Sequence, residues 1–263
     1  MDLSNTRSLF ISDVHLGSTH ARTAELLEFL SVIKETARPE KLYIVGDFID
    51  GWKLKRNWYW NDEASLVIRK ILSFLRRDTE ILYVAGNHDE FMREFIDDFH
   101  LSDFGSIHLG NEFIHETVSG KRLLVTHGDM FDLATKYARW LCWVGDVGYD
   151  FLLHANRFNN WARRKIGCKP WSLSKAVKHN VKQAVNFISS FEQHLVHYAR
   201  EKDCAGCVCG HIHTADLKML DDGFAYVNTG DWVESLTAVV EDHSGRFGLY
   251  HHHTKTIDPI LPI

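Results

Sequence analysis

The chain has 263 residues, a formal net charge of −5 and 45% apolar residues. These values are typical of a soluble globular protein with a sizeable buried core, and the negative charge gives no reason to expect nucleic acid as a partner. The sequence shows no signal peptide and no apolar stretch near the roughly 20 residues that a membrane-spanning helix needs. An odd number of cysteines, five, fits a reducing cytoplasm.

The first half of the chain alternates short apolar strands with amphipathic helices. Apolar runs predict strands over residues 9–12, 41–45 and 81–85, and helical spacing predicts helices over 21–37, 63–77 and 90–99. A hairpin is expected next, with strands over 113–118 and 121–126. The last strands are expected over 207–209, 224–228, 236–241 and 247–251. This order favours a layered α/β fold.

The segment between the two groups of strands, residues 130–202, has a different composition. It shows helical patterning and holds 12 Lys or Arg against 5 Asp or Glu. We predict a helical cap inserted into one domain that spans residues 1–263. Its basic side chains have two interpretations: a solvated helix face, or a collar for substrate phosphate or anionic lipid headgroups. The second would place the protein peripherally on the inner face of the cell membrane.

Five of the predicted strands are followed directly by side chains that bind divalent metal ions. These side chains are Asp13, His15, Asp47, Asn87, His127, His211 and His213. Open α/β sheets bind their ligands at the carboxyl ends of the strands, so we expect the seven groups to converge. A single Asp-x-His pair is more often part of a solvated loop, but seven such groups at five strand ends indicate a metal site.

A pair of divalent ions about 3.5–4 Å apart is a common centre for cleaving phosphoesters. We expect one ion to be held by Asp13, His15 and His213, and a second by Asn87, His127 and His211, with Asp47 as the bridge. Carboxylate and amide oxygens combined with imidazoles suit Mn, Fe or Zn better than Ca. Such ions lower the pKa of water toward neutrality and so supply the nucleophile.

Two further residues follow the expected ligand Asn87 directly and are candidates for catalysis. His88 is assigned to the leaving-group oxygen or the transition-state charge, as an acid or hydrogen-bond donor. Asp89 is expected to orient the His88 ring.

The order of these motifs resembles that of the calcineurin-like metallophosphoesterase superfamily. Its pattern D-x-H, G-D, G-N-H-[DE], H and G-H-x-H is matched in order at residues 13–15, 46–47, 86–89, 127 and 210–213. The resemblance extends from Phe10 to His213. It implies a two-sheet β-sandwich core flanked by helices and a dinuclear metal centre at one edge, with manganese common in bacterial members.

Within that superfamily the chain resembles the bacterial UDP-2,3-diacylglucosamine diphosphatase group of the lipid A pathway. The likeness is carried by residues 46–52, residues 126–129 and the basic, aromatic insertion. It implies hydrolysis of a lipid-linked diphosphate, a cap that receives acyl chains, and substrate contacts from Trp52, Asn57, Arg157 and Arg164. One residue departs from the group, because its best-known members have Arg where this chain has His88, the residue of the general superfamily pattern.

Two other functions are compatible with the same residues. A hydrolase of a soluble nucleotide, or of another small phosphodiester or phosphomonoester, would use the same metal centre without the lipid. A non-catalytic docking scaffold would keep the fold, but scaffolds can lose metal ligands, and all seven are present here together with His88. Detergent dependence and liposome binding separate the lipid substrate from the soluble one.

Overall fold

The computed structural model describes residues 2–98, 107–131, 188 and 190–263. The chain forms two compact units, residues 1–129 together with 195–263, and residues 130–194. The first unit contains both sheets and all seven expected metal ligands. Most of the predicted cap at 130–202 lies outside the described residues, of which 190–201 form a continuous helix, so the cap stays a prediction. No helix in the described part of the chain is long and apolar enough to span a membrane.

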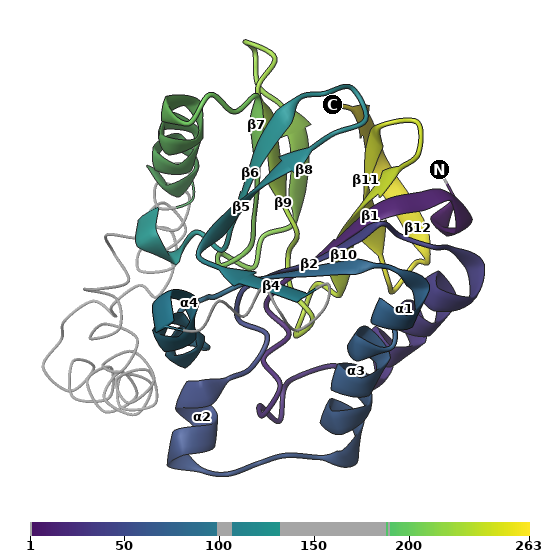
Figure 1. Cartoon of the computed structure of the whole chain (residues 1–263), viewed down its shortest axis with the longest axis vertical. Helices are drawn as coiled ribbons and strands as arrows, with labels where there is room; N and C mark the ends of the chain where they lie inside the picture. The colour runs from purple at the N-terminus through teal and green to yellow at the C-terminus, as the bar shows by residue number, and fades with distance from the viewer. Residues whose placement is uncertain (1, 99–106, 132–187, 189) are drawn as a thin grey trace, which may run out of the picture. The chain divides into compact units, whose positions relative to one another are not determined.

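The larger sheet has seven strands in the order β12-β11-β10-β1-β2-β3-β4 (Figure 1). Their bounds are Thr6–Ile11 for β1, Lys41–Val45 for β2, Glu80–Val84 for β3, Ile107–Gly110 for β4, Thr237–Asp242 for β10, Arg246–His251 for β11 and Thr256–Pro262 for β12. Strands β1 to β4 run parallel, and β10 joins β1 antiparallel. Because β1, β2 and β3 are parallel neighbours, the loops that carry Asp13, Asp47 and Asn87 leave the sheet at the same end.

The second sheet has five strands in the order β5-β6-β7-β9-β8 and occupies the upper part of Figure 1. Its strands are β5 (Glu112–Glu116), β6 (Arg122–Thr126), β7 (Gly206–Cys209), β8 (Asp216–Met219) and β9 (Ala225–Asn228). Strands β6 and β7 are parallel neighbours, so His127 and His211 also follow the same end of their sheet. The predicted α/β fold with two sheets is confirmed.

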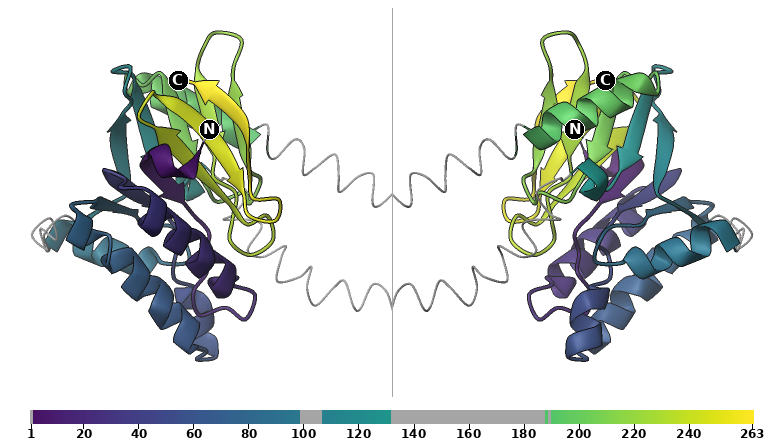
Figure 2. Two further views of the ribbon diagram at one scale, coloured as in Figure 1. Left: turned by 90° about the vertical axis from the view of Figure 1, so that its right-hand side faces the viewer. Right: turned by 90° about the vertical axis from the view of Figure 1, so that its left-hand side faces the viewer.

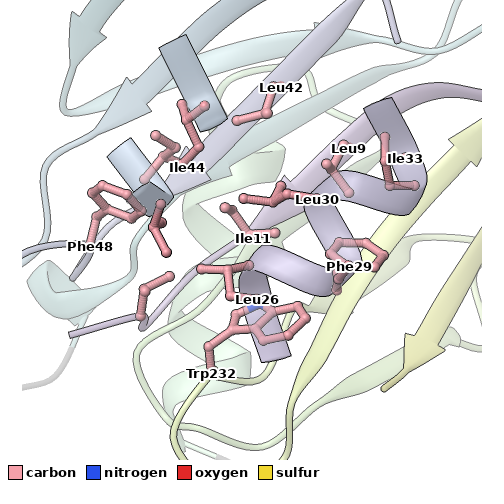
Figure 3. Close-up of a cluster of buried hydrophobic side chains, with 14 of the residues drawn as sticks. Leu9, Ile11, Leu26, Phe29, Leu30, Ile33, Leu42, Ile44, Phe48 and Trp232 are labelled. Atoms are coloured by element: carbon pink, nitrogen blue, oxygen red, sulfur yellow. The ribbon is translucent and has the colours of Figure 1, made fainter. Parts of the chain in front are cut away.

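Two amphipathic helices cover one face of the larger sheet. The buried side chains of α1 (Thr23–Thr36) include Leu26 and Leu30, and α3 (Asp62–Leu72) lies beside α1. Figure 3 shows Leu26 and Leu30 packed against Leu9 and Ile11 of β1, and the side views of Figure 2 show these helices on one side of the strands. Complete burial of one such leucine stabilises the fold by about 1.5–3 kcal/mol.

The opposite face of the larger sheet packs against the second sheet. Phe10 and Val45 on this face share a buried cluster with Val125 and Val227 of the second sheet. Both faces of the central strands are therefore buried, which explains why their sequences are continuous apolar runs instead of alternating ones.

In the described part of the chain, one α-helix and three strands were not predicted from the sequence patterns. Helix α2 (Gly51–Arg56) follows β2, and its first turn is capped by the Asp50 carboxylate, which accepts a hydrogen bond from the Lys53 backbone N–H. Strands β4, β8 and β12 all lie at sheet edges. Two predicted helices are shorter than expected: α3 ends at Leu72, and residues 90–98 divide into a 3-10 turn (Glu90–Arg93) and α4 (Glu94–Asp98).

Candidate metal centre

Two clusters of possible ligand atoms lie at the carboxyl ends of the central strands. Asp13, His15 and His213 form the first cluster, and Asp47, His127 and His211 form the second. Within each cluster the ligand atoms lie within 4.8 Å of one another. The first cluster has the three residues expected from the sequence. The second contains the expected His127 and His211, but with Asp47, the expected bridge, in place of Asn87. The structure thus brings together six of the seven expected ligands by this criterion.

The distances within the clusters suit coordination of an ion. His213 Nε2 lies 3.3 Å from Asp13 Oδ1, and His127 Nε2 lies 3.3 Å from Asp47 Oδ2. His15 Nε2 lies 3.9 Å from both Asp13 Oδ1 and Asp47 Oδ2, so it stands between the two carboxylates. Ligand atoms that sit about 2.1 Å from one ion lie roughly 3–4 Å from each other, which matches these separations.

Four buried ligand atoms have no hydrogen-bond partner in the described part of the chain. They are Asp13 Oδ1, His15 Nε2, Asn87 Oδ1 and His127 Nε2. A buried polar atom without a partner costs about 1–3 kcal/mol, and native proteins leave few of them. Their concentration at one place, with oxygen and imidazole donors, fits bound divalent cations. Asn87 has the correct type of free atom to join the second cluster.

In both Asp13 and Asp47, one carboxylate oxygen accepts a backbone hydrogen bond and the other faces the imidazoles of its cluster. Asp13 Oδ2 accepts the His211 backbone N–H at 3.0 Å and so ties a loop of the second sheet to β1. Asp47 Oδ1 accepts the His88 backbone N–H at 2.8 Å. The remaining oxygens, Asp13 Oδ1 and Asp47 Oδ2, are the ones that face the imidazoles. These backbone hydrogen bonds thus hold both carboxylates in an orientation suited to binding an ion.

The loops that hold the ligands use an unusual backbone conformation. Five of the expected ligands have a positive φ between 51° and 71°, namely Asp13, His15, Asp47, His211 and His213. Residues other than glycine rarely adopt this region, and it costs of order 1–3 kcal/mol at each position. Such strain persists only where the surrounding structure enforces it, and it is concentrated here at the ends of β1, β2 and β7.

Two motif glycines are required because the carboxylates approach the backbone closely. A Cβ at Gly86 would lie 2.3 Å from Asp47 Oδ1, and a Cβ at Gly210 would lie 2.4 Å from Asp13 Oδ2. Both distances are far below van der Waals contact. Glycine at these positions therefore allows the Asp47 and Asp13 side chains to occupy the centre of the site.

The outer nitrogens of three imidazoles face oxygen atoms of the protein, and one of them is hydrogen-bonded. His127 Nδ1 lies 2.9 Å from the carbonyl oxygen of Val45 and must donate to it, which leaves Nε2 free to bind an ion. His15 Nδ1 lies 3.7 Å from Asp50 Oδ2, and His213 Nδ1 lies 3.8 Å from Asp231 Oδ2. The sequence analysis did not include Asp50 or Asp231 among the site residues.

The carboxylates and imidazoles change one another's pKa. Burial raises the pKa of Asp47, but the His127 charge outweighs burial and holds that pKa far below its ordinary value. Burial lowers the pKa of His213, but the adjacent Asp13 carboxylate outweighs burial and raises this pKa to about 9. Asp47 likewise overcomes burial and raises the pKa of His127. This concentration of negative charge attracts cations.

The sequence profile of the calcineurin-like phosphoesterase family matches residues 6–215, the range that holds all seven expected ligands. The chain belongs to this family. Among its relatives is the UDP-2,3-diacylglucosamine hydrolase of Porphyromonas gingivalis, which is 30% identical over 269 residues covering 89% of this chain and 93% of the relative. The hydrolase of the same name from Psychromonas ingrahamii is 28% identical over 243 residues, covering 89% of this chain and 92% of the relative.

A third relative, the UDP-2,3-diacylglucosamine hydrolase of Haemophilus influenzae, is 23% identical over 256 residues, covering 92% of this chain and 97% of the relative. Among solved structures, a dimetal phosphatase from Danio rerio is similar with a TM-score of 0.46 and 10% identity, covering 93% of this chain and 95% of that chain.

In this phosphoesterase, His88 contacts a buried carboxylate that the sequence analysis missed. His88 Nδ1 lies 3.0 Å from Asp50 Oδ1, and Asp50 is only 1% exposed. Asp50 therefore contacts both His88 and the expected ligand His15, and the three residues form a further group with converging ligand atoms. Asp50 also caps α2. The sequence patterns did not predict that helix, and they gave no signal for either role of Asp50.

The structure corrects the expected role of Asp89. Its carboxylate accepts hydrogen bonds from the backbone N–H groups of Phe48 and Gly86 and from the Tyr83 hydroxyl, while the His88 ring is held by Asp50. Asp89 thus joins the loop after β3 to the loop after β2. The reason is geometric: its carboxylate points into the protein, where it is completely buried.

The four expected substrate contacts have different positions. The Trp52 ring lies against His88, with ring centroids 4.1 Å apart, so Trp52 belongs to the site. Asn57 is an exposed residue at the end of α2, where its backbone N–H bonds to the Lys53 carbonyl. Arg157 and Arg164 lie outside the described residues.

Proposed function

We propose that this phosphoesterase is a two-metal hydrolase that cleaves a phosphoanhydride or phosphoester bond, with UDP-2,3-diacylglucosamine or a related lipid-linked diphosphate as substrate. The observation that carries the reaction class is the pair of ligand clusters with four buried, unpartnered ligand atoms. Support for the substrate comes from relatives named UDP-2,3-diacylglucosamine hydrolase, which match this chain along most of its length.

Each cluster would hold one divalent ion. Asp13, His15 and His213 would bind the first, Asn87, His127 and His211 the second, and Asp47 would lie between them. Bound ions supply Lewis-acid activation of the phosphoryl group and an activated water molecule. We propose Mn²⁺ as the ion, with Fe and Zn suited to the same ligands.

The protein's own contribution is to place a proton donor beside the reacting group. The rings of His88 and His15 lie edge to face with centroids 4.6 Å apart, so His88 lies next to the first cluster. Asp50 and Trp52 hold the His88 ring from two sides. In this position His88 would donate a proton or a hydrogen bond to the leaving-group oxygen.

Hydrolysis of UDP-2,3-diacylglucosamine by purified protein with added Mn²⁺ tests the proposal, with a bis-aryl phosphodiester assayed beside it. Turnover of the lipid substrate at a far higher kcat/KM supports the full proposal. Cleavage of the aryl ester alone supports the metal-dependent reaction and rejects the lipid substrate in favour of a soluble one. Loss of all activity after chelation, with recovery on adding Mn²⁺, is expected in either case.

Replacement of the bridging carboxylate provides a second test. Asp47→Asn removes the charge next to both His127 and His15, so we expect turnover of either substrate to be abolished and metal content to fall. Asp78→Asn is the matched control, because Asp78 also has a positive φ, but it is exposed at the end of the 3-10 helix Leu75–Arg77 and is not an expected ligand. Full activity of purified Asp47→Asn protein would reject the site assignment.

A further inference from the structure

A cavity of about 730 Å³ opens beside the first ligand cluster. It is lined by His15, His213 and His88, by Asp50 and Lys53, and by residues 18–22 together with Val233 and Glu234. The volume lies in the range of pockets for whole small-molecule ligands and is far larger than one phosphate group needs. Because the cavity adjoins His88, the part of the substrate that it receives is the leaving group.

Most of the residues that line the cavity have polar side chains. Among its lining residues in the described part of the chain, only Ala21 and Val233 are apolar. The lining includes two side-chain cations, Lys53 and Arg22, which remain about half exposed. Two carboxylates, Asp50 and Glu234, line the cavity as well. The two cations are the groups that could bind an anionic part of the leaving group.

The fold places Lys53 at a defined position in this wall. Lys53 Nζ donates to Ser18 Oγ at 2.9 Å and lies 3.9 Å from Asp50 Oδ2, the carboxylate that also holds His88. Gly17 permits this arrangement, because a Cβ there would lie 2.7 Å from the Leu54 side chain of α2. Helix α2 can therefore pack directly on the loop that carries Ser18.

We propose that Lys53, together with the Ser18 hydroxyl, binds a second anionic group on the leaving group, immediately next to the phosphorus that is attacked. Lys53 and His88 both lie next to the Asp50 carboxylate. An anion bound by Lys53 would therefore lie beside the leaving-group oxygen to which His88 would donate. The substrate class is then a diphosphate whose leaving group is itself a phosphomonoester, such as a sugar 1-phosphate. The inference rests on the proposed function and adds the residue that selects a diphosphate over a simple ester.

Comparison of two substrates in three variants tests this proposal. Lys53→Met should lower kcat/KM for a diphosphate-linked substrate about 10- to 100-fold more than for a bis-aryl phosphodiester, which has no second anion. Lys53→Arg should recover most of the loss because it keeps the charge. Lys55→Met is the matched control, because Lys55 is an exposed lysine on the same helix that does not line the cavity, and both activities should stay unchanged.

Inhibition separates this inference from the identity of the substrate. Glucosamine 1-phosphate should inhibit bis-aryl phosphodiester hydrolysis by the wild-type protein, with an inhibition constant about tenfold weaker in Lys53→Met. If the wild type cleaves the aryl ester but not UDP-2,3-diacylglucosamine, the proposed substrate is wrong and the inhibition still tests the subsite. Equal inhibition of wild type and Lys53→Met, or equal loss on both substrates, overturns the inference.

Discussion

Asp50 contacts three groups of the site at once, and this makes it the most informative single residue outside the ligand clusters. Its two oxygens face the His88 ring, the His15 ring and the Lys53 side chain. Burial raises its pKa, but the contacts with His15 and His88 outweigh burial and hold the pKa far below its ordinary value. Asp50 is therefore an ionised carboxylate that positions both a ligand and the proposed proton donor.

We expect Asp50→Asn to lower kcat/KM about 10- to 100-fold while metal content stays near that of the wild type, because the ligand atoms of the clusters remain in place. Asp62→Asn, an exposed position on α3, should leave both quantities unchanged. Metal analysis and steady-state kinetics on the same preparations check this prediction.

A double substitution identifies the residue through which Asp50 acts. His88→Ala alone should slow the reaction and keep the metals. If Asp50 acts through His88, then Asp50→Asn should add little further loss in a His88→Ala background. A full additional loss in that background would show that Asp50 acts through His15 instead.

The strand-end motifs of the sequence predicted the ligand clusters well, because the apolar runs and the residues after them are adjacent in the chain. The partners of those residues were not predicted. Asp50 and Asp231 lie near His15 and His213 only because the fold brings their loops together, and each also accepts local backbone hydrogen bonds. The role expected for Asp89 was wrong for the same reason: adjacency to His88 in sequence did not bring the two side chains together.

At the scale of strands and helices, the prediction failed at the borders of the sheets. Central strands β1, β2 and β3 are buried on both faces and were recognised as apolar runs. Edge strands β4, β8 and β12 carry polar residues or proline, as in Asp216–Met219 and Thr256–Pro262, because one of their sides lacks a neighbouring strand. The pattern that identifies a strand from sequence is thus a measure of its burial.

The tight loop after β3 leads to a prediction about glycine. Gly86→Ala should displace the Asp47 carboxylate, because the new methyl group would lie 2.3 Å from Asp47 Oδ1, and should cause loss of bound metal and of activity. Gly120→Ala is the control: its φ of +79° disfavours alanine, but nothing lies within 4 Å of the added Cβ. That variant should lose about 1 kcal/mol of stability and keep its metals and kcat. Full metal content in Gly86→Ala would contradict this account of the loop.

At the scale of the whole sheet-bearing unit, a buried polar network joins the two sheets. Glu241 on β10 accepts hydrogen bonds from Ser8 and Arg7 on β1 and lies 3.0 Å from His115 Nε2 on β5. His115 Nδ1 in turn lies 3.1 Å from the Tyr43 hydroxyl. Both Glu241 and His115 are completely buried, so loss of one partner would leave others unpaired.

Glu241→Gln should therefore lower the free energy of unfolding by about 3 kcal/mol at neutral pH. Burial raises the Glu241 pKa, but the His115, Ser8 and Arg7 contacts outweigh it and hold the pKa below 4.5. A carboxyl group whose pKa is lowered by folding stabilises the folded protein at pH values above its unfolded-state pKa. The loss of unfolding free energy in Glu241→Gln should therefore be constant above about pH 5.5. This loss of unfolding free energy should become smaller as the pH falls through the pKa of Glu241 in the folded protein.

Denaturant unfolding at several pH values measures this deficit. Glu116→Gln serves as the control, because Glu116 follows His115 on β5 but its side chain is exposed. A deficit that grows at acidic pH would show that the network is not stabilised by an ionised Glu241.

The hydrogen bond from the His211 backbone to Asp13 connects residues 198 positions apart. During synthesis, Asp13, Asp47 and Asn87 therefore leave the ribosome long before the two histidines that complete their clusters. Until β7 has been made and has paired with β6, neither of the two proposed ions would have its full set of ligands. Metal uptake is thus expected late in folding. The ligand loops would adopt their strained final geometry only after β7 has paired with β6.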